Sequence, residues 1–237
     1  MKRVYKSVAA YVVDGGWGVT LDGKPLRTPA KRDLTVPSEA LAAAIAAEWD
    51  AQTPDIRPET MPLTRLAATA IDRTAAERDK IVAEIANYAG TDLVCYRAEH
   101  PPALAARQQA VWQPLLDWAA GRYDAGLAVT TGIVPVTQSP ASVKAYANVV
   151  AAFDDFRLTA LQAATGACGS LVIALALHER RLDAEAAFAA SQLDETFQIE
   201  AWGEDAEAVK RREALAADIA AVARFLELLG TPSRAAP

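Results

Sequence analysis

The chain has 237 residues, a formal net charge of −6 and a pI near 5.1. This length is sufficient for one large domain or two modest ones with a sizeable core. The acidic balance argues against a nucleic-acid-binding protein, which usually carries a basic face. The densest basic run, residues 210–212, lies among acidic residues and indicates a solvated helix face.

The first 36 residues are predicted to form a small β-meander. Val and Tyr are frequent before the turn signal Asp14-Gly15-Gly16, and Asp22-Gly23 is a strong hairpin signal. Pro25 and Pro29 favour edge or irregular strands at the end of the meander. The strands are expected at residues 4–13, 17–21, 26–28 and 34–36.

The remainder is predicted to be almost entirely helical. Ser38 is a suitable N-cap for the first helix, and Pro54, Pro58 and Pro62 indicate a rigid loop after it. Helices are expected at residues 38–52, 62–75, 77–89, 101–123, 140–152, 154–165, 168–180, 184–200 and 205–229, with residues 127–137 extended or in a loop. The predicted fold class is therefore α+β, with a small mixed α/β domain at residues 1–74 and a larger all-α helical domain at residues 75–237.

One segment is long enough to span a bilayer. Residues 158–177 carry no charge over 20 residues. Their alanine, glycine, threonine and glutamine content makes them only weakly hydrophobic, which favours a central helix buried in a helical bundle. Gly166 and Gly169 are expected to let helices approach closely. A membrane-associated scaffold built on this segment remains an alternative.

The usual residues of catalysis and metal binding are scarce. Only two histidines occur; His100 precedes two prolines and His178 is expected to end a helix, where the helix dipole favours it. Neither belongs to an HExxH motif, and no phosphate-binding loop or GxSxG motif is present. Cys95 and Cys168 lack metal-ligand spacing and are expected to be free, buried thiols. We therefore expect no cofactor, no metal and no small-molecule substrate.

An acidic stretch near the C-terminus is the remaining candidate site. It contains Phe197 and Trp202, and no Lys or Arg separates its acids: Asp194, Glu195, Glu200, Glu204, Asp205 and Glu207. Three interpretations are open. The stretch is a solvated helix end, a protein-binding surface, or a catalytic pair of carboxylates. Tryptophan is enriched at interface hot spots and acids can steer a basic partner, which favours binding over catalysis.

Five blocks along the chain resemble those of a known family. They are residues 21–29 (LDGKPLRTP), 41–52 (LAAAIAAEWDAQ), 61–67 (MPLTRLA), 91–97 (TDLVCYR) and 198–204 (QIEAWGE). In this order they resemble the assembly chaperones of the ATP synthase α subunit, and together they cover nearly the whole chain. Trp49 and Arg65 also match family blocks and are interpreted as structural residues.

The resemblance implies a binding protein rather than an enzyme. It would hold the unassembled α subunit of the catalytic head and prevent its aggregation before assembly with the β subunit. Glu200, Trp202 and Glu204 are the expected partner-binding residues, with Asp194 and Glu195 as further candidates. A hydrolase using carboxylates near Glu200 is the alternative. Residues 1–6 lack a signal peptide or import presequence, so we expect a bacterial cytoplasmic protein without stable membrane insertion.

Overall fold

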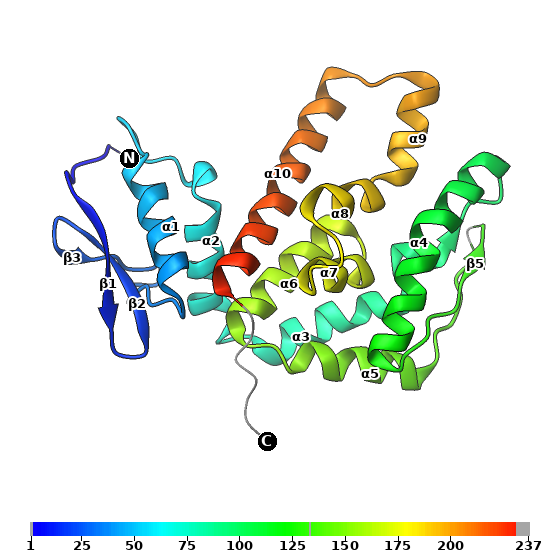
Figure 1. Ribbon diagram of the computed structural model, residues 1–237, viewed down its shortest axis with the longest axis horizontal. Helices are drawn as coiled ribbons and strands as arrows, with labels where there is room; N and C mark the ends of the chain where they lie inside the picture. The colour runs from blue at the N-terminus through cyan, green and yellow to red at the C-terminus, as the bar shows by residue number, and fades with distance from the viewer. Residues whose placement is uncertain (1, 133, 231–237) are drawn as a thin grey trace. The chain divides into compact units, whose positions relative to one another are not determined.

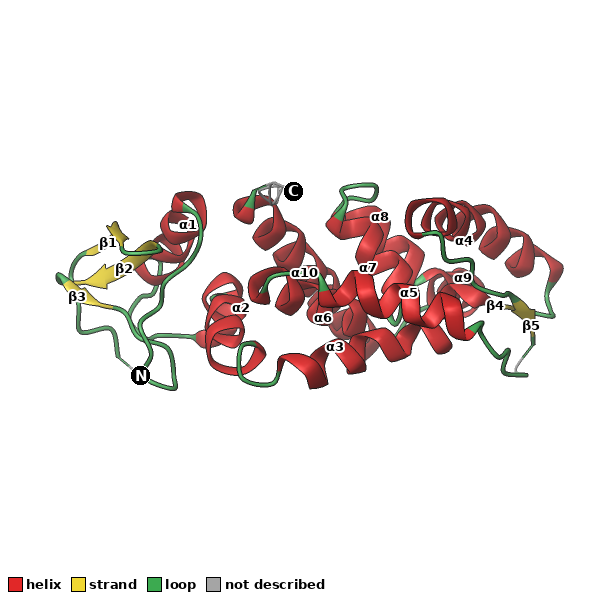
Figure 2. Ribbon diagram, turned by 90° about the horizontal axis from the view of Figure 1, so that it is seen from below, coloured by secondary structure: helices red, strands yellow, loops and turns green. Residues whose placement is uncertain are grey.

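The computed structural model describes residues 2–132 and 134–230, which form two compact units (Figure 1). Unit 1 consists of three segments: the N-terminal segment up to Arg78, Asp155–Ala160, and the C-terminal segment that begins at Arg224. Unit 2 consists of Asp79–Asp154 and Leu161–Ala223. A small antiparallel sheet at the N-terminus precedes a series of helices (Figure 2), which confirms the predicted α+β class. The domains predicted at residues 1–74 and 75–237 stay a prediction, and residues 1 and 231–237 of those ranges lie outside the described part.

The N-terminal sheet consists of three antiparallel strands. β1 (Val8–Val13) pairs with β2 (Gly16–Leu21), and β2 pairs with the short β3 (Lys24–Pro25). The β2–β3 turn is the predicted Asp22-Gly23 hairpin, where both residues have positive φ. The hairpin signal was therefore sufficient to locate this turn.

The third and fourth predicted strands are reduced to isolated backbone contacts with β2. The amide of Leu26 donates to the carbonyl of Val19 at 2.8 Å, and Trp17 exchanges two backbone hydrogen bonds with Val36. Pro25 has no N–H to donate, so the ladder of β3 stops there. Leu26 and Val36 nevertheless occupy positions along the edge of β2 opposite to β1.

Helix α1 (Glu39–Asp50) packs on the sheet and begins at the predicted cap. The hydroxyl of Ser38 accepts a hydrogen bond from the amide of Leu41 at 3.1 Å. Helix α2 (Pro62–Thr69) follows and continues as a π-helical turn, Ala70–Thr74. The core of the sheet and α1 is formed by buried aliphatic side chains: Val19, Leu26, Leu34, Val36, Leu41 and Ile45.

Distant parts of the chain complete unit 1. The Ser38 hydroxyl also donates to the carbonyl of Leu228 at 2.6 Å, and the Arg157 guanidinium donates to the carbonyl of Gly230 at 2.8 Å. The rings of Phe156 and Phe225 stack with centroids 6.5 Å apart. These residues belong to two helices that contribute to both units, α6 (Asp155–Cys168) and α10 (Ala206–Leu229).

Unit 2 is a helical bundle with one small parallel ribbon. Helix α7 (Leu171–His178) packs against α4 (Pro102–Tyr123) and α8 (Ala184–Ser191), and its seven residues before His178 are all buried. The indole of Trp112, itself buried, donates to the carbonyl of Ala190 at 2.8 Å and so ties α4 to α8. The other elements are α3 (Arg78–Asn87), β4 (Tyr96–Arg97), β5 (Thr130–Thr131), α5 (Pro140–Ala151) and α9 (Leu193–Trp202), with short 3-10 turns at Pro58–Thr60, Tyr88–Gly90 and Leu93–Cys95.

The uncharged segment 158–177 is two helices rather than one. Helix α6 ends at Cys168, Gly169 adopts a positive φ of 63°, and the Ser170 hydroxyl caps α7 by accepting from the amide of Ile173 at 3.0 Å. A Cβ at Gly166 or Gly169 would meet no atom within 4 Å, so the predicted close helix approach at these glycines is wrong. None of the helices in the described ranges is long and apolar enough to cross a membrane.

The helix predicted at residues 184–200 is also divided. The backbone of Gln192 leaves the helical region, with φ −107° and ψ 25°, which separates α8 from α9. The preceding Ser191 hydroxyl donates back to the carbonyl of Phe188 at 2.9 Å, a local bond that competes with helix continuation. This break sets the direction of α9, which carries most of the acidic stretch.

Candidate functional site

The acidic stretch occupies α9 and its connection to α10. Asp194 and Glu195 lie in the first turn of α9, and Glu200 and Trp202 lie near its end. Gly203 ends the helix with a φ of 83°, and Glu204 lies in the connection. Figure 1 shows this connection joining α9 to the start of α10. All five predicted partner-binding residues therefore fall within one short stretch of unit 2.

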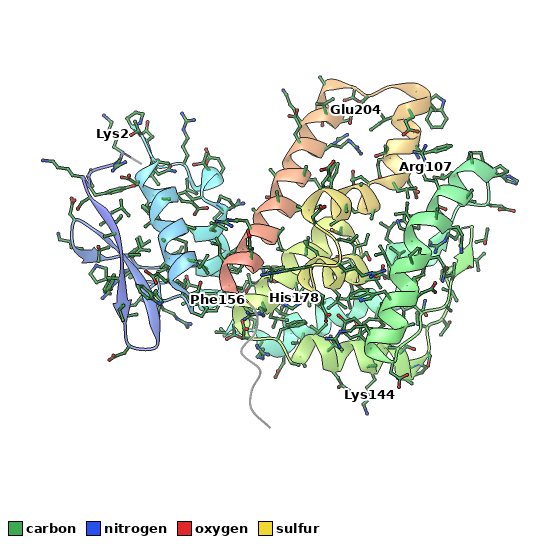
Figure 3. All side chains as sticks on the ribbon, viewed as in Figure 1. Lys2, Arg107, Lys144, Phe156, His178 and Glu204 are labelled. Carbon is green, nitrogen blue, oxygen red and sulfur yellow. The ribbon has the colours of Figure 1, made fainter. Side chains whose placement is uncertain are left out.

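Glu200 forms a two-pronged ion pair with Arg107 of α4. The two guanidinium nitrogens donate to the two carboxylate oxygens at 2.9 and 2.8 Å. The same guanidinium lies over the Phe197 ring, 5.3 Å from its centre. Figure 3 labels the Arg107 side chain. Hydrogen bonding from Arg107 lowers the pKa of Glu200, so this carboxylate is ionised at neutral pH. The pair therefore attaches the C-terminal end of α9 to α4.

Glu204 is paired with Arg212 of α10. The guanidinium lies 3.2 Å from a Glu204 oxygen, and only 21% of each side chain is exposed. Arg212 also donates to the Thr196 hydroxyl at 3.1 Å and lies over the Phe188 ring. The prediction that residues 210–212 form a solvated face is therefore wrong for Arg212. Its side chain joins the start of α10 to α8 and α9.

Asp194 takes part in a partly buried polar chain. It accepts a hydrogen bond from the Gln108 side-chain amide at 2.7 Å, and the Gln108 carbonyl oxygen accepts from the amide of Ala98 at the same distance. The Arg97 guanidinium is buried nearby; burial lowers its pKa, and the charge of Asp194 partly offsets this effect. Asp194 thus links α9 to α4 and to the end of β4.

Trp202 and Glu195 face outward instead. Trp202 is 81% exposed, which is unusual for so large an apolar side chain, and Glu195 is exposed as well. Both line an open groove of about 420 Å³ between α9 and α10, which we call the α9–α10 groove. Its lining residues are Gln192, Glu195, Gln198, Ile199, Trp202, Gly203, Ala208, Arg211, Arg212 and Leu215.

A second groove lies on the other side of α9 and is predominantly aliphatic. It has a volume of about 380 Å³ and lies between α4, α8 and α9; we call it the α4–α8 groove. Alanine side chains on α8 are too short to fill the space, which leaves the hollow open. The lining residues are Arg107, Val111, Leu115, Leu182, Ala186, Ala189, Ala190, Leu193 and Thr196. Arg107 thus belongs both to this groove and to the ion pair with Glu200.

The carboxylates are poorly arranged for acid catalysis. A general acid at neutral pH needs a raised pKa, whereas hydrogen bonding lowers the pKa of both Glu200 and Asp205. For Asp205 the donors are the amides of Ala208 and Glu207, because this residue caps α10. Among the residues that the structure describes, no group of three or more His, Cys, Asp or Glu side chains is placed to hold a metal ion.

The first four family-like blocks serve mainly to hold the fold together. Asp22 accepts three hydrogen bonds from Lys6 and Ser7 beside the hairpin turn. Glu48 caps α2 by accepting from the amides of Leu63 and Thr64 at 2.7 and 2.8 Å. Trp49 packs beside the buried Tyr5, Ile56 and Met61, as the structural interpretation predicted. Asp92, fully buried, binds the amides of Val94 and Val172.

The fifth family-like block, residues 198–204, differs from the other four because its Trp202 side chain is exposed to solvent. The family model described as ATP12 chaperone protein matches residues 2–120, just over half of the chain. The chain belongs to the ATP12 chaperone family. The resemblance to ATP synthase assembly chaperones is thereby confirmed.

Relatives of known structure extend the match to residues beyond the family model. The crystal structure of Atp12 from Paracoccus denitrificans is 44% identical, with a TM-score of 0.92, over 96% of this chain and 98% of that one. A mutant of the same Paracoccus protein gives 43% identity and the same TM-score over 96% and 97% of the two chains. The mitochondrial protein atp12 of Schizosaccharomyces pombe is 24% identical over 90% of this chain and 78% of its own length.

The basic partners of the acidic stretch were not predicted from the sequence. Arg107 lies 93 residues before Glu200, and no local pattern joins them. The spacing of Arg107, Val111 and Leu115 by four residues does place them on one face of a helix, which is the signal that identifies one wall of the α4–α8 groove.

Proposed function

We propose that this ATP12-family chaperone binds the unassembled α subunit of the ATP synthase catalytic head and prevents its aggregation until the β subunit joins it. The observation that carries this proposal is the exposed Trp202 beside an open groove in a family-like block. A side chain this exposed contributes little to the stability of the isolated chain, whereas tryptophans at the centre of interfaces often dominate binding energy.

The grooves on the two sides of α9 supply the contact surface in this proposal. A free ring subunit exposes apolar surface that is later buried by its neighbour, and such surface promotes aggregation. The aliphatic α4–α8 groove suits apolar side chains of the client, and the α9–α10 groove offers Trp202 and Ile199 beside charged groups. Binding there would shield the client without any chemical step.

The five acidic-stretch residues divide by role in this proposal. Trp202 and Glu195 contact the client directly, because they are exposed and line a groove. Glu200, Glu204 and Asp194 position α9, because each is bonded to a side chain of another helix. The partners are Arg107 and Gln108 of α4 and Arg212 of α10. Glu195 has no ion-pair partner among the described residues, and its negative charge favours approach of a basic client surface.

The same proposal includes the absence of catalysis, of a nucleic-acid partner and of a small-molecule substrate. The matching family model is described as a chaperone protein, and the lowered pKa of Glu200 gives no support to the hydrolase alternative. We further propose that the protein acts in the cytoplasm of a bacterium; the 44% identity to the Paracoccus protein supports this, and the fission-yeast relative is named as mitochondrial.

Co-expression with the α subunit tests the proposal. The α subunit of the same organism, expressed without its β partner, should accumulate in the soluble fraction only with the chaperone. Affinity capture followed by native mass spectrometry should give a stoichiometric complex. Added β subunit should displace the chaperone. Recovery of a different ATP synthase subunit, or an α subunit equally soluble without the chaperone, would overturn the proposal.

A further inference from the structure

Helix α9 is held in its place mainly by polar contacts. Of its ten residues only Leu193 is buried, whereas seven of the eight residues of α7 are buried. The contacts that tie α9 to α4 are the ion pair of Arg107 with Glu200 and the hydrogen bond from Gln108 to Asp194. A helix with so little buried apolar surface has low local stability.

The ion pair between α9 and α4 lies in solvent. The Arg107 and Glu200 side chains are 40% and 52% exposed. Exposed ion pairs contribute little net stability, and salt screens them. A ten-residue helix is also marginal in water without tertiary contacts. Release of α9 from α4 should therefore be accompanied by loss of its helical hydrogen bonds.

The backbone leaves the helical region at both ends of α9. Gln192 has φ −107° and ψ 25°, and Gly203 has φ 83° and ψ 177°. Movements of whole elements are usually absorbed by a few residues at element termini. These two residues can therefore let α9 move without unfolding α8 or α10.

Both grooves have α9 as one wall. Leu193 and Thr196 line the α4–α8 groove. Glu195, Ile199 and Trp202 line the α9–α10 groove. A displacement of α9 would therefore take both grooves apart in one step, and a client held in them would lose its contacts on both sides of the helix together.

Given the proposed function, on which this rests, we propose that undocking of α9 from α4 is the step that releases the client. The docked helix completes both grooves and captures the α subunit. The undocked segment, unfolded between Gln192 and Gly203, presents neither groove. Because few buried groups hold the docked state, it opens while the rest of unit 2 stays folded. An arriving β subunit takes the client during such an opening.

Hydrogen–deuterium exchange of the purified full chain tests undocking without any client. Amides of α9 should exchange much faster than those of α7, and faster still as the salt concentration is raised. Glu200→Gln removes the ion pair and should speed exchange in α9 about fivefold. Arg224→Gln is the matched control and should leave it unchanged, because Arg224 pairs with Glu227 inside α10. Exchange in α9 as slow as in α7, or unaffected by Glu200→Gln, would overturn the proposal.

A covalent tie between α9 and α4 tests the link to release. The variant Arg107→Cys/Glu200→Cys can be joined by a bismaleimide, since the native Cys95 and Cys168 are buried. The joined protein should capture the α subunit and yield it to added β subunit about tenfold more slowly than the wild type. The same variant with each new thiol blocked by N-ethylmaleimide is the control, and it should capture poorly.

Two results of this second experiment would also overturn the proposal. One is a joined protein that yields the client as fast as the wild type. The other is a joined protein that fails to capture a client that the wild type captures. A wild type that captures no α subunit overturns the proposed function instead, and exchange in α9 then still decides whether the helix undocks.

Discussion

Arg107 and Glu200 connect α4 to the end of α9 by a two-pronged ion pair, with nitrogen–oxygen distances of 2.9 and 2.8 Å. Within the proposed function, this geometry assigns Glu200 a positioning role. Glu200→Arg places two guanidinium groups side by side, and we expect it to lower capture of the α subunit in a pull-down. The variant Arg107→Glu/Glu200→Arg rebuilds the pair in reverse and should recover most of the capture. A double variant as defective as Glu200→Arg would instead mean that Glu200 contacts the client itself.

Replacement of Trp202 should change binding of the α subunit without changing the stability of the chaperone. Because its side chain is 81% exposed, Trp202→Ala should leave the thermal midpoint nearly unchanged. If Trp202 is an interface hot spot worth about 2 kcal/mol, its loss weakens the affinity for the α subunit roughly thirtyfold. Isothermal titration calorimetry or surface plasmon resonance with the α subunit measures this change. Val134→Ala is the matched control, since Val134 is 67% exposed and lines neither groove. Equal affinity of both variants would remove Trp202 from the client-binding surface.

Asp92 should make the stability of the protein depend on pH. Burial raises the pKa of this carboxyl from 3.8 to about 6, so the folded chain binds the proton more tightly than the unfolded chain. Its contribution to stability is fully present below about pH 4 and is lost as the pH rises through about 6, a fall of about 3 kcal/mol in the free energy of unfolding.

Urea unfolding at a series of pH values gives the free energy of unfolding of the wild type and of Asp92→Asn. The asparagine side chain stays neutral at every pH, so this variant is the reference. Other carboxyl groups affect both proteins alike, so the informative quantity is the difference between the two curves. That difference should change in the window between about pH 4 and pH 6.5 and be flat above it. Parallel curves would show that Asp92 has an ordinary pKa.

The two thiols should be inert in the folded protein. Cys95 and Cys168 are free and buried, as predicted, and burial raises the pKa of each to about 12. The reactive thiolate fraction at pH 8 is then roughly a thousandfold below that of an ordinary cysteine. Ellman's reagent should detect neither thiol in native buffer and both in urea. Rapid reaction of one thiol in native buffer would reveal an opening motion near it.

The parts of the fold with strong local signals were predictable. Ser38 located the start of α1, and Asp22-Gly23 located the β2–β3 turn, because caps and tight turns depend on a few adjacent residues. A break between helices 154–165 and 168–180 was predicted a few residues before the observed one at Gly169. The break at Gln192 was missed, because it depends on the backbone of that one residue. The third strand was predicted at residues 26–28, whereas β3 consists of Lys24 and Pro25.

The candidate site was located by resemblance, and its geometry was not predictable. Nothing local in the sequence indicates that Arg107 meets Glu200, or that Arg212 is enclosed by Glu204, Thr196 and Phe188. Such pairs follow from how α4, α8, α9 and α10 pack, and helix packing depends on the whole bundle. The sequence of residues 194–207 therefore predicted more unpaired negative charge on this surface than the structure has, because Glu200 and Glu204 are paired with arginines of other helices.

Unit 1 has a consequence for how the protein is made. The Ser38 hydroxyl bonds to the carbonyl of Leu228, which is translated 190 residues later, and Arg157 bonds to the carbonyl of Gly230, which is translated 73 residues later. The sheet and α1 must therefore wait for a much later part of the chain before their contacts are complete. Until then their apolar surfaces stay partly uncovered, so this chaperone is itself a protein whose early folding intermediates need protection.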